Sequence, residues 1–556
     1  MSSTTPATLP GLMMDCPLLV SSILAHAVKN HPRRGVVSRD GAEIVRFSYA
    51  AFGERVARLA NALRRLGIEP GARVASFGWN SHRHLELYYA VPSMGAVLHT
   101  VNIRLFPEQV AGTIAHAADR IVFVDGSLVG AVRAAIGADP ALGECRFVIM
   151  GAADATLPNA VDYESLIADE PPAFAWPRLD ENSAAVMCFT SATTGDPKAA
   201  LFSHRSTFLH ALATAAADVF ALAERDVVLP IVPMFHVNAW GLPFVAPLVG
   251  ASLVMPAARL DPASLIELIE SEGVTFSAGV PTVWFALRDA LHARGAGLAS
   301  LERVVIGGSA VPPALFDDLE ALGTRVIHAW GMTEMSPIGT VSTVTAELVT
   351  APPELRRRER LKQGPFSVIV DWKIVDDDGN AVAADGRSRG ELWVRGPAIA
   401  ASYYKNERAS AAAFVDGWFH TGDIVTIDAY GFMEIVDRSK DLIKSGGEWI
   451  SSVEVENVLM GHPAVREACV FGVTHARWIE RPIAAVVARA GVTASEDELR
   501  AWLGERIAKW WIPDRVVFLE AIPRTGVGKF LKRALRERYA DLLNSGTDVV
   551  AKNPLG

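Results

Sequence analysis

The sequence "SAAVMCFTSATTGDPK", residues 183–198, joins a short apolar run to a loop that is rich in hydroxyl groups. The apolar part is typical of a buried strand that ends near residue 190. Backbone amides in a tight turn, together with hydroxyl groups and an ammonium group, can surround the oxygens of a polyphosphate. The candidate phosphate-binding residues of the loop are Thr190, Ser191, Thr193, Thr194, Gly195 and Lys198. Hydroxyl-rich turns are also common on ordinary surfaces, so the loop alone leaves both interpretations open.

Strands and helices alternate on both sides of this loop, up to about residue 430. One helix is expected at 49–67, where Ser48 can cap the first turn and Gly67 suits the C-terminal end. The other helices are predicted at 264–273 and 313–323, and the strands at 73–79, 120–125, 183–190, 274–280 and 303–308. This alternation predicts an α/β fold with a large N-terminal domain of parallel-rich sheets, which helices cover on both faces.

The character of the chain changes near "DRSKDLIKSGGEWIS", residues 437–451. About a hundred residues follow, which is the size of a small α+β domain. The elements predicted there are helices at 451–462 and 495–510 and strands at 467–473, 483–489 and 515–523. We therefore divide the chain into an N-terminal domain, residues 1–437, and a C-terminal domain, residues 438–556. The charged segment 351–364 is expected to be a solvated surface stretch.

The composition limits the kinds of partner and location. The net charge of −9 and the pI of about 5.9 come from acidic and basic residues mixed along the chain, which argues against nucleic-acid binding. The four cysteines are far apart, so they indicate neither a disulfide framework nor a zinc site, and a reducing cytoplasm is the expected location. The first twenty residues lack a basic region, and Asp15 interrupts their apolar part, so no signal peptide is expected.

Residues 229–258 form an apolar segment without any Asp, Glu, Lys or Arg. Its thirty residues are long enough to span a bilayer as a helix. Proline breaks helices, however, and the segment contains five prolines, at positions 230, 233, 243, 247 and 256. We expect a buried segment that lines a hydrophobic cavity and no transmembrane segment, with membrane contact as the alternative.

Four further motifs follow the hydroxyl-rich loop: "HAWGMTEMSP" at 328–337, "WFHTGD" at 418–423, the stretch at 437–451, and "PRTGVGKF" at 523–530. In this order and spacing, the five motifs resemble those of the adenylate-forming acyl-CoA synthetase family, which includes fatty-acyl-CoA ligases, aryl-CoA ligases and luciferases. The resemblance covers about residues 20–545. It implies an enzyme that requires ATP and Mg²⁺. Such an enzyme joins a carboxylic acid to AMP, releases pyrophosphate and transfers the acyl group to coenzyme A.

The resemblance assigns the nucleotide and metal sites to particular residues. It implies that Glu334 and Thr190 hold Mg²⁺ on the ATP phosphates and that Thr333 binds the α-phosphate. Asp423 would accept hydrogen bonds from the ribose hydroxyls, with Arg438 as its companion. The adenine slot and the space between base and acyl group would be lined by His328, Ala329, Trp330, Gly331, Gly308, Ser309 and Ala310. A salt-bridged surface glutamate and a capping aspartate are the plainer alternatives.

The resemblance also makes Lys529 the main catalytic residue, because it would neutralise the attacking carboxylate and the α-phosphate while the adenylate forms. Lys440 matches the hinge about which a mobile C-terminal domain would rotate to admit coenzyme A. Gly446 and Gly447 would then line the pantetheine tunnel, where a side chain would obstruct the thiol. The neighbouring candidates are Lys444, for the adenylate or pyrophosphate, and Glu448 and Trp449, for the substrate.

The stretch "VPMFHVNAWGLP", residues 232–243, is similar to its counterpart in medium- and long-chain fatty-acyl-CoA ligases and in 3-methylthiopropionate-CoA ligases. The similarity implies that His236, a candidate catalytic residue, and Val237 wall the acyl pocket and that Trp240 gates it. An ordinary core tryptophan is the alternative. Each methylene of the acid contributes only about 1 kcal/mol or somewhat more to selectivity, so the sequence does not determine the chain length.

The hydroxyl-rich loop departs from the family pattern where Ala192 and Ala199 replace two glycines. Alanine adopts a positive φ less readily than glycine, so the loop could differ in shape from that of the family. The effect of this change on ATP affinity and on turnover of the enzyme stays open. Because Lys529, Glu334 and Asp423 are all present, we expect an active ligase for a medium or long aliphatic acid. The alternatives are a short-acid ligase, an acceptor other than coenzyme A, and a catalytically impaired nucleotide- or acyl-binding protein. A homodimer stays open as the oligomeric state.

Overall fold

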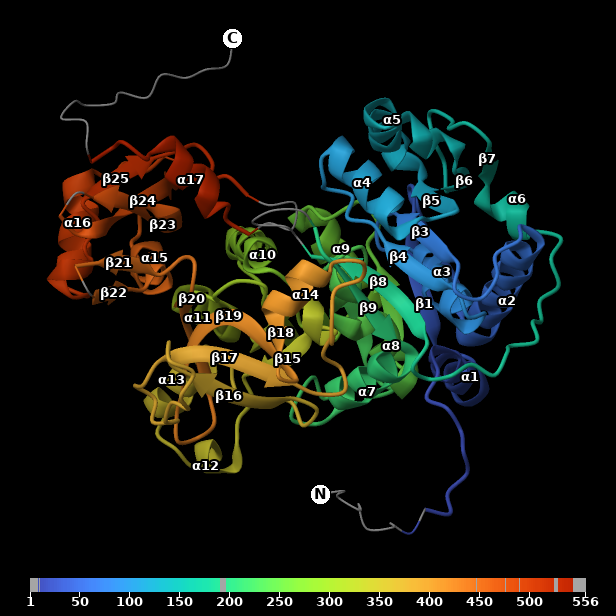
Figure 1. Ribbon diagram of the computed structural model, residues 1–556, viewed down its shortest axis with the longest axis horizontal. Helices are drawn as coiled ribbons and strands as arrows, with labels where there is room; N and C mark the ends of the chain where they lie inside the picture. Colours follow the sequence, from blue (N-terminus) through green and yellow to red (C-terminus); the bar gives the residue numbers. More distant parts are fainter. Residues whose placement is uncertain are drawn as a thin grey trace, which may run out of the picture.

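The computed structural model describes residue 9 and residues 11–190, 197–446, 448–475, 477–489, 491–524 and 529–543. The described residues form four β-sheets with helices packed around them. Figure 1 shows the last elements of the chain, from β21 (Ile443–Ser445) to α17 (Lys532–Arg538), gathered at one end of the molecule and the blue N-terminal helices at the other. The mixed α/β class predicted from the sequence is therefore confirmed.

The first sheet has eight strands, and its inner strands are parallel to their neighbours. Only the two edge strands are antiparallel. The strand order is β15 (Ile338–Val341), β14 (Arg325–Gly331), β13 (Arg303–Ile306), β12 (Phe276–Gly279), β10 (Val227–Pro230), β11 (Ser252–Met255), β1 (Gly35–Asp40) and β2 (Glu43–Ser48). The carboxyl ends of the parallel strands therefore share one edge of the sheet, where binding sites of α/β folds form.

The second sheet has seven strands and is parallel except for its last pair. The order is β7 (Ala160–Asp162), β6 (Arg146–Met150), β5 (Ile121–Asp125), β3 (Arg73–Phe77), β4 (Val97–Thr100), β8 (Ala184–Phe189) and β9 (Ala199–Ser203). The apolar run that opened the sequence analysis is thus strand β8. It pairs with β9, so the two ends of the hydroxyl-rich loop lie side by side.

Helices fill the connections between these strands. They are α1 (Val20–Asn30), α2 (Tyr49–Arg65), α3 (His82–Ser93), α4 (Pro107–Ala117), α5 (Val129–Ala138), α6 (Tyr163–Ile167), α7 (His204–Ala215), α8 (Leu242–Val249), α9 (Pro262–Glu272), α10 (Pro281–Arg294) and α11 (Pro313–Ala321), with 3₁₀ turns η1 (Gly126–Leu128), η2 (Pro140–Glu144), η3 (Val237–Gly241) and η4 (Thr333–Met335). Helix α2 confirms the predicted signals, since the Ser48 side chain accepts a hydrogen bond from the Ala51 backbone and Gly67 has a φ of 80°.

A third sheet, which the sequence analysis did not predict, follows the two parallel ones. Its five antiparallel strands are β16 (Asp371–Val375), β17 (Gly390–Arg395), β19 (Trp418–Ile427) and β18 (Phe414–Val415) in order, with β20 (Met433–Arg438) paired to β19, and α14 (Glu407–Ala413) precedes β18. Tight turns replace crossover helices here. After β16, for example, the Asp376 carboxylate accepts the Asn380 backbone N–H at 2.8 Å, and Gly379 has a φ of 83°.

The C-terminal elements form a fourth sheet of five strands. Its order is β22 (Glu448–Ile450), β21 (Ile443–Ser445), β24 (Ile479–Ala488) and β23 (Val465–His475), with β25 (Arg515–Phe518) paired to β24. The other elements of this part are α15 (Ser452–Met460), α16 (Glu496–Gly504), η5 (Lys509–Trp511) and α17 (Lys532–Arg538). The helix predicted at 495–510 was too long: α16 ends at Gly504, and the Arg506 and Ile507 N–H groups both donate to the Leu503 carbonyl in a turn.

The apolar segment 229–258 is buried, as predicted, and consists of β10, η3, α8 and β11 with short connections. Pro243 and Pro247 are nevertheless accommodated within α8. Pro247 has no N–H to donate to the Pro243 carbonyl, and the Tyr89 hydroxyl donates to that carbonyl instead, at 2.7 Å. None of the helices in the described part of the chain combines the length and apolar character that crossing a membrane requires.

The charged segment 351–364 differs from its prediction as a plain solvated stretch. It contains helix α13 (Pro353–Leu361), which follows the short helix α12 (Ala346–Val349). Glu359 is only 1% exposed and forms an ion pair with Lys362 at 2.5 Å. Arg360 binds Glu320 of α11 at 2.7 Å. The charged side chains of segment 351–364 therefore attach helix α13 to the body of the protein and are not simply solvated.

Candidate active site

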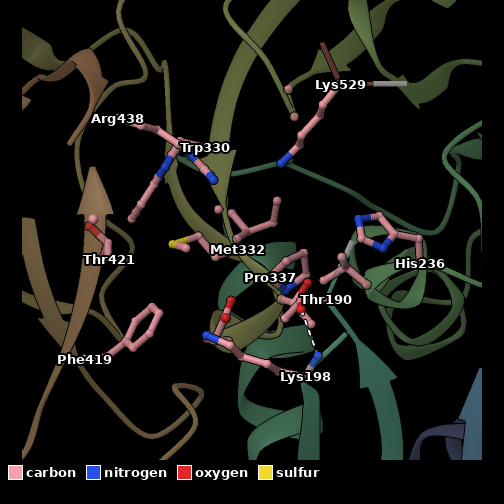
Figure 2. Close-up of a pocket in the computed structure, with 18 of the residues that line it drawn as sticks. Thr190, Lys198, His236, Trp330, Met332, Pro337, Phe419, Thr421, Arg438 and Lys529 are labelled. Carbon is pink, nitrogen blue, oxygen red and sulfur yellow. Dashed lines mark hydrogen bonds between the residues drawn. The ribbon is translucent and has the colours of Figure 1, made fainter. Parts of the chain in front are cut away.

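Two adjoining cavities of about 490 and 890 Å³ lie between the sheets. The smaller one is bounded by the ends of β8 and β9, by η3, by the β14–η4 connection and by β19. The larger one continues past α13 and α15 to α17. Figure 2 shows side chains from these separate elements, including those of Thr190, His236, Trp330 and Lys529, around the smaller cavity.

Most of the residues singled out by the sequence analysis line these cavities. The smaller cavity is lined by Thr190, Lys198, His236, Val237, Trp240, Gly308, Ala329, Trp330, Gly331, Thr333, Glu334, Arg438 and Lys529. The larger one adds Ser309, Ala310, His328, Asp423 and Lys440. Residues up to 339 positions apart in sequence, Thr190 and Lys529, therefore face one space.

A second group of predicted residues lies away from both cavities. Lys444, Gly446 and Trp449 belong to the β21–β22 hairpin, where the Lys444 ammonium lies 4.4 Å from the centre of the Trp449 ring. Glu448 is part of strand β22. The predictions for Ser191, Thr193, Thr194, Gly195 and Gly447 lie outside the described residues.

A polar triad of Trp330, Asp423 and Arg438 lines the larger cavity. Asp423 lies on β19 opposite Arg438 on β20, and it is only 1% exposed. The Trp330 indole N–H donates to Asp423 Oδ2 at 2.8 Å, and Arg438 Nε lies 3.1 Å from Oδ1. Each carboxylate oxygen keeps a second lone pair for a ligand hydroxyl. Arg438 in turn has a raised pKa, chiefly because of Asp423.

Oxygen-bearing side chains of Thr190, Glu334 and Tyr403 line the smaller cavity. Glu334, on η4, is 6% exposed, and its carboxylate accepts a hydrogen bond from the Tyr403 hydroxyl at 2.6 Å. Thr190 holds the ends of the hydroxyl-rich loop together: its hydroxyl accepts the Lys198 backbone N–H at 3.1 Å, and its own N–H donates to the Lys198 carbonyl at 2.8 Å. A carboxylate and a hydroxyl are hard donors that fit Mg²⁺, with phosphate oxygens completing the shell.

Lys529 extends toward the smaller cavity in Figure 2 and lines both cavities. Burial, together with the smaller effect of the neighbouring cation Arg438, lowers its pKa to about 8. Asp423 and Glu334 act in the opposite direction, since their negative charges favour the ammonium. The ammonium therefore lies within the electrostatic reach of both the triad and Glu334.

One wall of the smaller cavity is mostly apolar and comes from the segment 229–258. It is formed by Val232, Pro233, His236, Val237 and Trp240, and Val280 also lines the cavity. Burial lowers the pKa of His236 to about 3, so its imidazole is neutral near pH 7. The Trp240 ring lies against the backbone of Gly307, where an added Cβ would be 3.4 Å from Trp240 Cη2 and 2.6 Å from the Ala329 carbonyl oxygen. Larger residues would not fit at that position.

An unusual backbone conformation carries Trp240 to this place. Four consecutive residues of η3, from Val237 to Trp240, have φ values between 43° and 56°, and Gly241 has a φ of 81°. Left-handed conformations cost about 1–2 kcal/mol for each non-glycine residue. The Val237 N–H donates to the Cys188 thiol sulfur at 3.1 Å, which attaches the turn to strand β8. Strain of this kind is typical of functional sites.

The sequence analysis missed several residues of the cavity wall. Tyr403 is the most connected of them, because it contacts Glu334 and its ring lies 5.0 Å below the Lys198 ammonium. Others include Met332, Pro337, Glu391, Phe419, His420, Thr421 and Gly422. Tyr403 follows a short connection after β17 that carries no helical or strand periodicity, so only the tertiary structure reveals its position.

The fold and the cavities are those of an α/β protein with a binding site between its sheets, and comparison with family models identifies the family. The model of the AMP-binding enzyme matches residues 24–404, and the model of the AMP-binding enzyme C-terminal domain matches residues 454–529. The chain therefore belongs to the AMP-binding enzyme family, and the resemblance stated from the five motifs is confirmed.

Three curated relatives cover nearly the whole chain. A medium-chain-fatty-acid–CoA ligase of Ectopseudomonas oleovorans is 44% identical, over 96% of this chain and 98% of its own. A 3-methylmercaptopropionyl-CoA ligase of Ruegeria pomeroyi is also 44% identical, over 96% and 99%. A long-chain-fatty-acid–CoA ligase of Thermus thermophilus is 46% identical, over 95% and 97%.

Solved structures agree with the fold. ATP-bound MatB from Rhodopseudomonas palustris superposes with a TM-score of 0.81 at 25% identity, and covers 95% of this chain and all of its own. An anthranilate CoA ligase in complex with anthranoyl-AMP gives a TM-score of 0.85 at 24% identity over 95% and 99% of the two chains, which supports the fold alone.

Proposed function

We propose that the protein is an ATP-dependent, AMP-forming acid–CoA ligase that acts on a medium or long aliphatic acid. One observation carries the proposal: Lys529, Glu334, Thr190 and the Trp330–Asp423 pair surround connected cavities, and the smaller cavity has an apolar wall. Relatives that are 44–46% identical over almost their whole length are acyl-CoA ligases by name. An arrangement with cations, oxygen donors and an apolar wall suits a reaction between a nucleotide and an acid with an apolar tail.

In the first step, a carboxylate oxygen of the acid attacks the α-phosphorus of ATP, and pyrophosphate leaves. Asp423 would hold the ribose hydroxyls while Trp330 fixes the carboxylate of Asp423. The Lys529 ammonium would reduce the repulsion between the acid and the α-phosphate. The Thr333 hydroxyl would donate a hydrogen bond to the α-phosphate. Bound Mg²⁺, which Glu334 and Thr190 would hold, would supply positive charge to the phosphates.

In the second step, the thiol of coenzyme A attacks the acyl carbonyl, and AMP leaves. We propose that residues 438–556 rotate about Lys440 for this step, relative to residues 1–437. The chain passes from the third to the fourth sheet between Arg438 and Ile443, which supports a division at this point. Gly446 and Trp449 are not among the residues that line the two cavities, which agrees with a hairpin that would approach only after rotation.

The acid would extend along the wall formed by His236, Val237 and Trp240. A neutral His236 suits an apolar chain and does not introduce a charge there. The position of the Trp240 ring against Gly307 also supports the alternative of a short acid, such as 3-methylthiopropionate, because the indole limits the space that is available to the acyl chain. The relatives include ligases named for both kinds of acid.

The other aspects of the proposal concern location and assembly. A reducing cytoplasm agrees with the absence of disulfides among the four cysteines, which are all free. A homodimer stays our proposal for the oligomeric state. A catalytically impaired binding protein is disfavoured, because the chain keeps Lys529, Glu334 and Asp423 in suitable positions.

The proposal is tested by incubating the purified protein with ATP, Mg²⁺, coenzyme A and acids from C3 to C18, while AMP and acyl-CoA are measured by chromatography. We expect AMP and acyl-CoA in equal amounts, with the largest kcat/KM for one range of chain length. AMP formation with none of the acids would contradict the enzymatic function. Acyl-AMP without acyl-CoA would indicate another acceptor.

A further inference from the structure

Residues 396–404 pass between the Glu334 side of the cavity and the end of the hydroxyl-rich loop. The Ala400 N–H donates to the Glu334 carbonyl at 2.7 Å, and the Ser336 hydroxyl donates to the Ala398 carbonyl at 2.8 Å. At the other end, the Tyr404 N–H donates to the Ala199 carbonyl at 2.9 Å. This segment therefore fixes the backbone of η4 relative to strand β9.

Tyr403 makes the contacts that matter within this segment. It is 6% exposed, and its hydroxyl donates to Glu334 Oε1 at 2.6 Å. The face of its ring lies 5.0 Å from the Lys198 ammonium, a favourable cation–π distance. The Ser410 hydroxyl accepts its backbone N–H at 2.9 Å, and Phe414 contacts the ring edge to face. Tyr403 is therefore itself held in place.

We propose that Tyr403 is a positioning residue that orients the Glu334 carboxylate toward a divalent cation on the nucleotide phosphates and keeps Lys198 at the same phosphates. The proposal rests on the proposed function, since it requires a metal–ATP complex in the cavity. The hydroxyl donates its hydrogen bond to one carboxylate oxygen of Glu334, and the other oxygen would bind the cation. The same ring restricts the ammonium of Lys198, so one side chain organises an anion and a cation.

The charges around Glu334 explain why the carboxylate needs such a partner. The negative charge of Glu334 raises the pKa values of both Lys529 and Arg438, so the carboxylate attracts both cations. Without the hydroxyl, the carboxylate would be free to turn toward these cations. A hydrogen bond to a charged group is strong enough that its loss should change the affinity of a well-oriented ligand about tenfold.

The Tyr403→Phe variant removes the hydroxyl and keeps the ring. The matched control is Tyr404→Phe, because Tyr404 is adjacent and its hydroxyl has no hydrogen bond within the described residues. The binding of Mn²⁺ as a probe, with ATP and without any acid, is measured by electron paramagnetic resonance for both variants and the wild type. ATP binding with EDTA is measured by calorimetry, and the melting temperature reports folding.

We expect Tyr403→Phe to weaken Mn²⁺ binding in the presence of ATP about tenfold, with ATP binding in EDTA changed less than twofold and Tyr404→Phe like the wild type. In a Glu334→Gln background, Tyr403→Phe should have no further effect on Mn²⁺, because the two groups act together. This second comparison still tests the proposal if the single variant is less stable.

Two results would overturn the proposal while the proposed function stands. They are unchanged Mn²⁺ binding in Tyr403→Phe, and an equal loss of ATP binding with and without metal, which would show a merely structural role. A wild-type protein that binds Mn²⁺ no better with ATP than without it would contradict the proposed metal–ATP site, and the role of Tyr403 with it.

Discussion

The ammonium group of Lys529 lies between charges of both signs, and its pKa determines when it can act. Burial and Arg438 lower this pKa to about 8, despite the opposing effect of Asp423 and Glu334. The charged form exists below the pKa, so the proposed charge stabilisation is present at pH 7 and is lost as the pH rises through about 8.

The first prediction follows from this sign. For the adenylate-forming step, kcat/KM reports groups of the free enzyme and should fall about tenfold per pH unit above pH 8. Lys529→Arg should be slower but should lack this fall, because a guanidinium stays charged. The measurement is the acid-dependent exchange of pyrophosphate into ATP between pH 6 and pH 10 at constant ionic strength. A fall that persists unchanged in the arginine variant would exclude Lys529 as its cause.

The second prediction concerns Trp240. Its ring lies against Gly307 on the apolar wall, whereas the proposed nucleotide contacts are made by Trp330 and Asp423. Trp240→Ala should therefore shift the chain-length optimum toward longer acids and change the KM for ATP less than about twofold, since the nucleotide contacts remain. The profile of kcat/KM from C3 to C18 measures the shift. An unchanged profile with a lower melting temperature would identify Trp240 as an ordinary core residue.

The left-handed turn η3 gives the third prediction, because a single glycine ends it. Gly241 has a φ of 81°, and an added Cβ would lie 2.9 Å from His210 Cε1. Gly273, at the end of α9, has a φ of 62° but nothing within 4 Å of an added Cβ, so it isolates the backbone effect. Gly273→Ala should lower the free energy of unfolding by about 1 kcal/mol. Gly241→Ala should lower it by about 2–3 kcal/mol, because a steric conflict is added. Urea denaturation of both variants measures the difference, and equal losses would contradict the packing described around η3.

Local sequence signals predicted some elements well and could not predict others. Ser48 and Gly67 marked the ends of α2 because capping is a local interaction. The prolines of segment 229–258 correctly argued against a long helix, but the pairing of Pro243 with Tyr89 is a tertiary contact between distant residues, so a short helix was not foreseen. The third sheet was missed because most of its connections lack a helix, so it does not show the regular strand–helix alternation that was the main signal.

The sequence predicted only those residues of the site that belong to recognisable motifs. The motifs named Glu334, Asp423 and Lys529, but no spacing rule brings residues 190 and 529 to one cavity. Tyr403 lacked any motif that the sequence analysis used, and the bond between Trp330 and Asp423 joins two residues that had been given separate roles. These contacts depend on how the sheets pack.

The whole molecule is held in the arrangement that brings Lys529 to the cavity by contacts on both sides of Lys440. The Ser451 hydroxyl donates to the Val436 carbonyl at 2.6 Å, and the Ser452 N–H donates to the Asp437 carboxylate at 2.7 Å. Residues 436 and 437 lie near the end of strand β20, whereas Ser451 caps helix α15 and Ser452 begins it. A rotation about Lys440 would have to break or rearrange these bonds.

The fourth prediction separates the two steps. Lys529→Ala should reduce adenylate formation by about 100-fold or more, yet leave transfer from a supplied acyl-AMP to coenzyme A within about threefold. Lys440→Pro, which restricts the backbone at the proposed hinge, should do the reverse. Single-turnover assays of each step measure the two effects, and circular dichroism serves as the folding control. Equal loss of both steps in both folded variants would remove the support for rotation.

Transfer of oxygen from the acid to AMP tests the central claim most directly. A carboxylate labelled with ¹⁸O on both oxygens, chosen from the most active acid, is incubated with ATP, Mg²⁺, coenzyme A and the protein, and the products are analysed by mass spectrometry. Attack of the carboxylate on the α-phosphorus followed by cleavage of the acyl C–O bond places one ¹⁸O in AMP and leaves the other in acyl-CoA. We predict this distribution. Unlabelled AMP, or label in ADP or inorganic phosphate, would contradict the account.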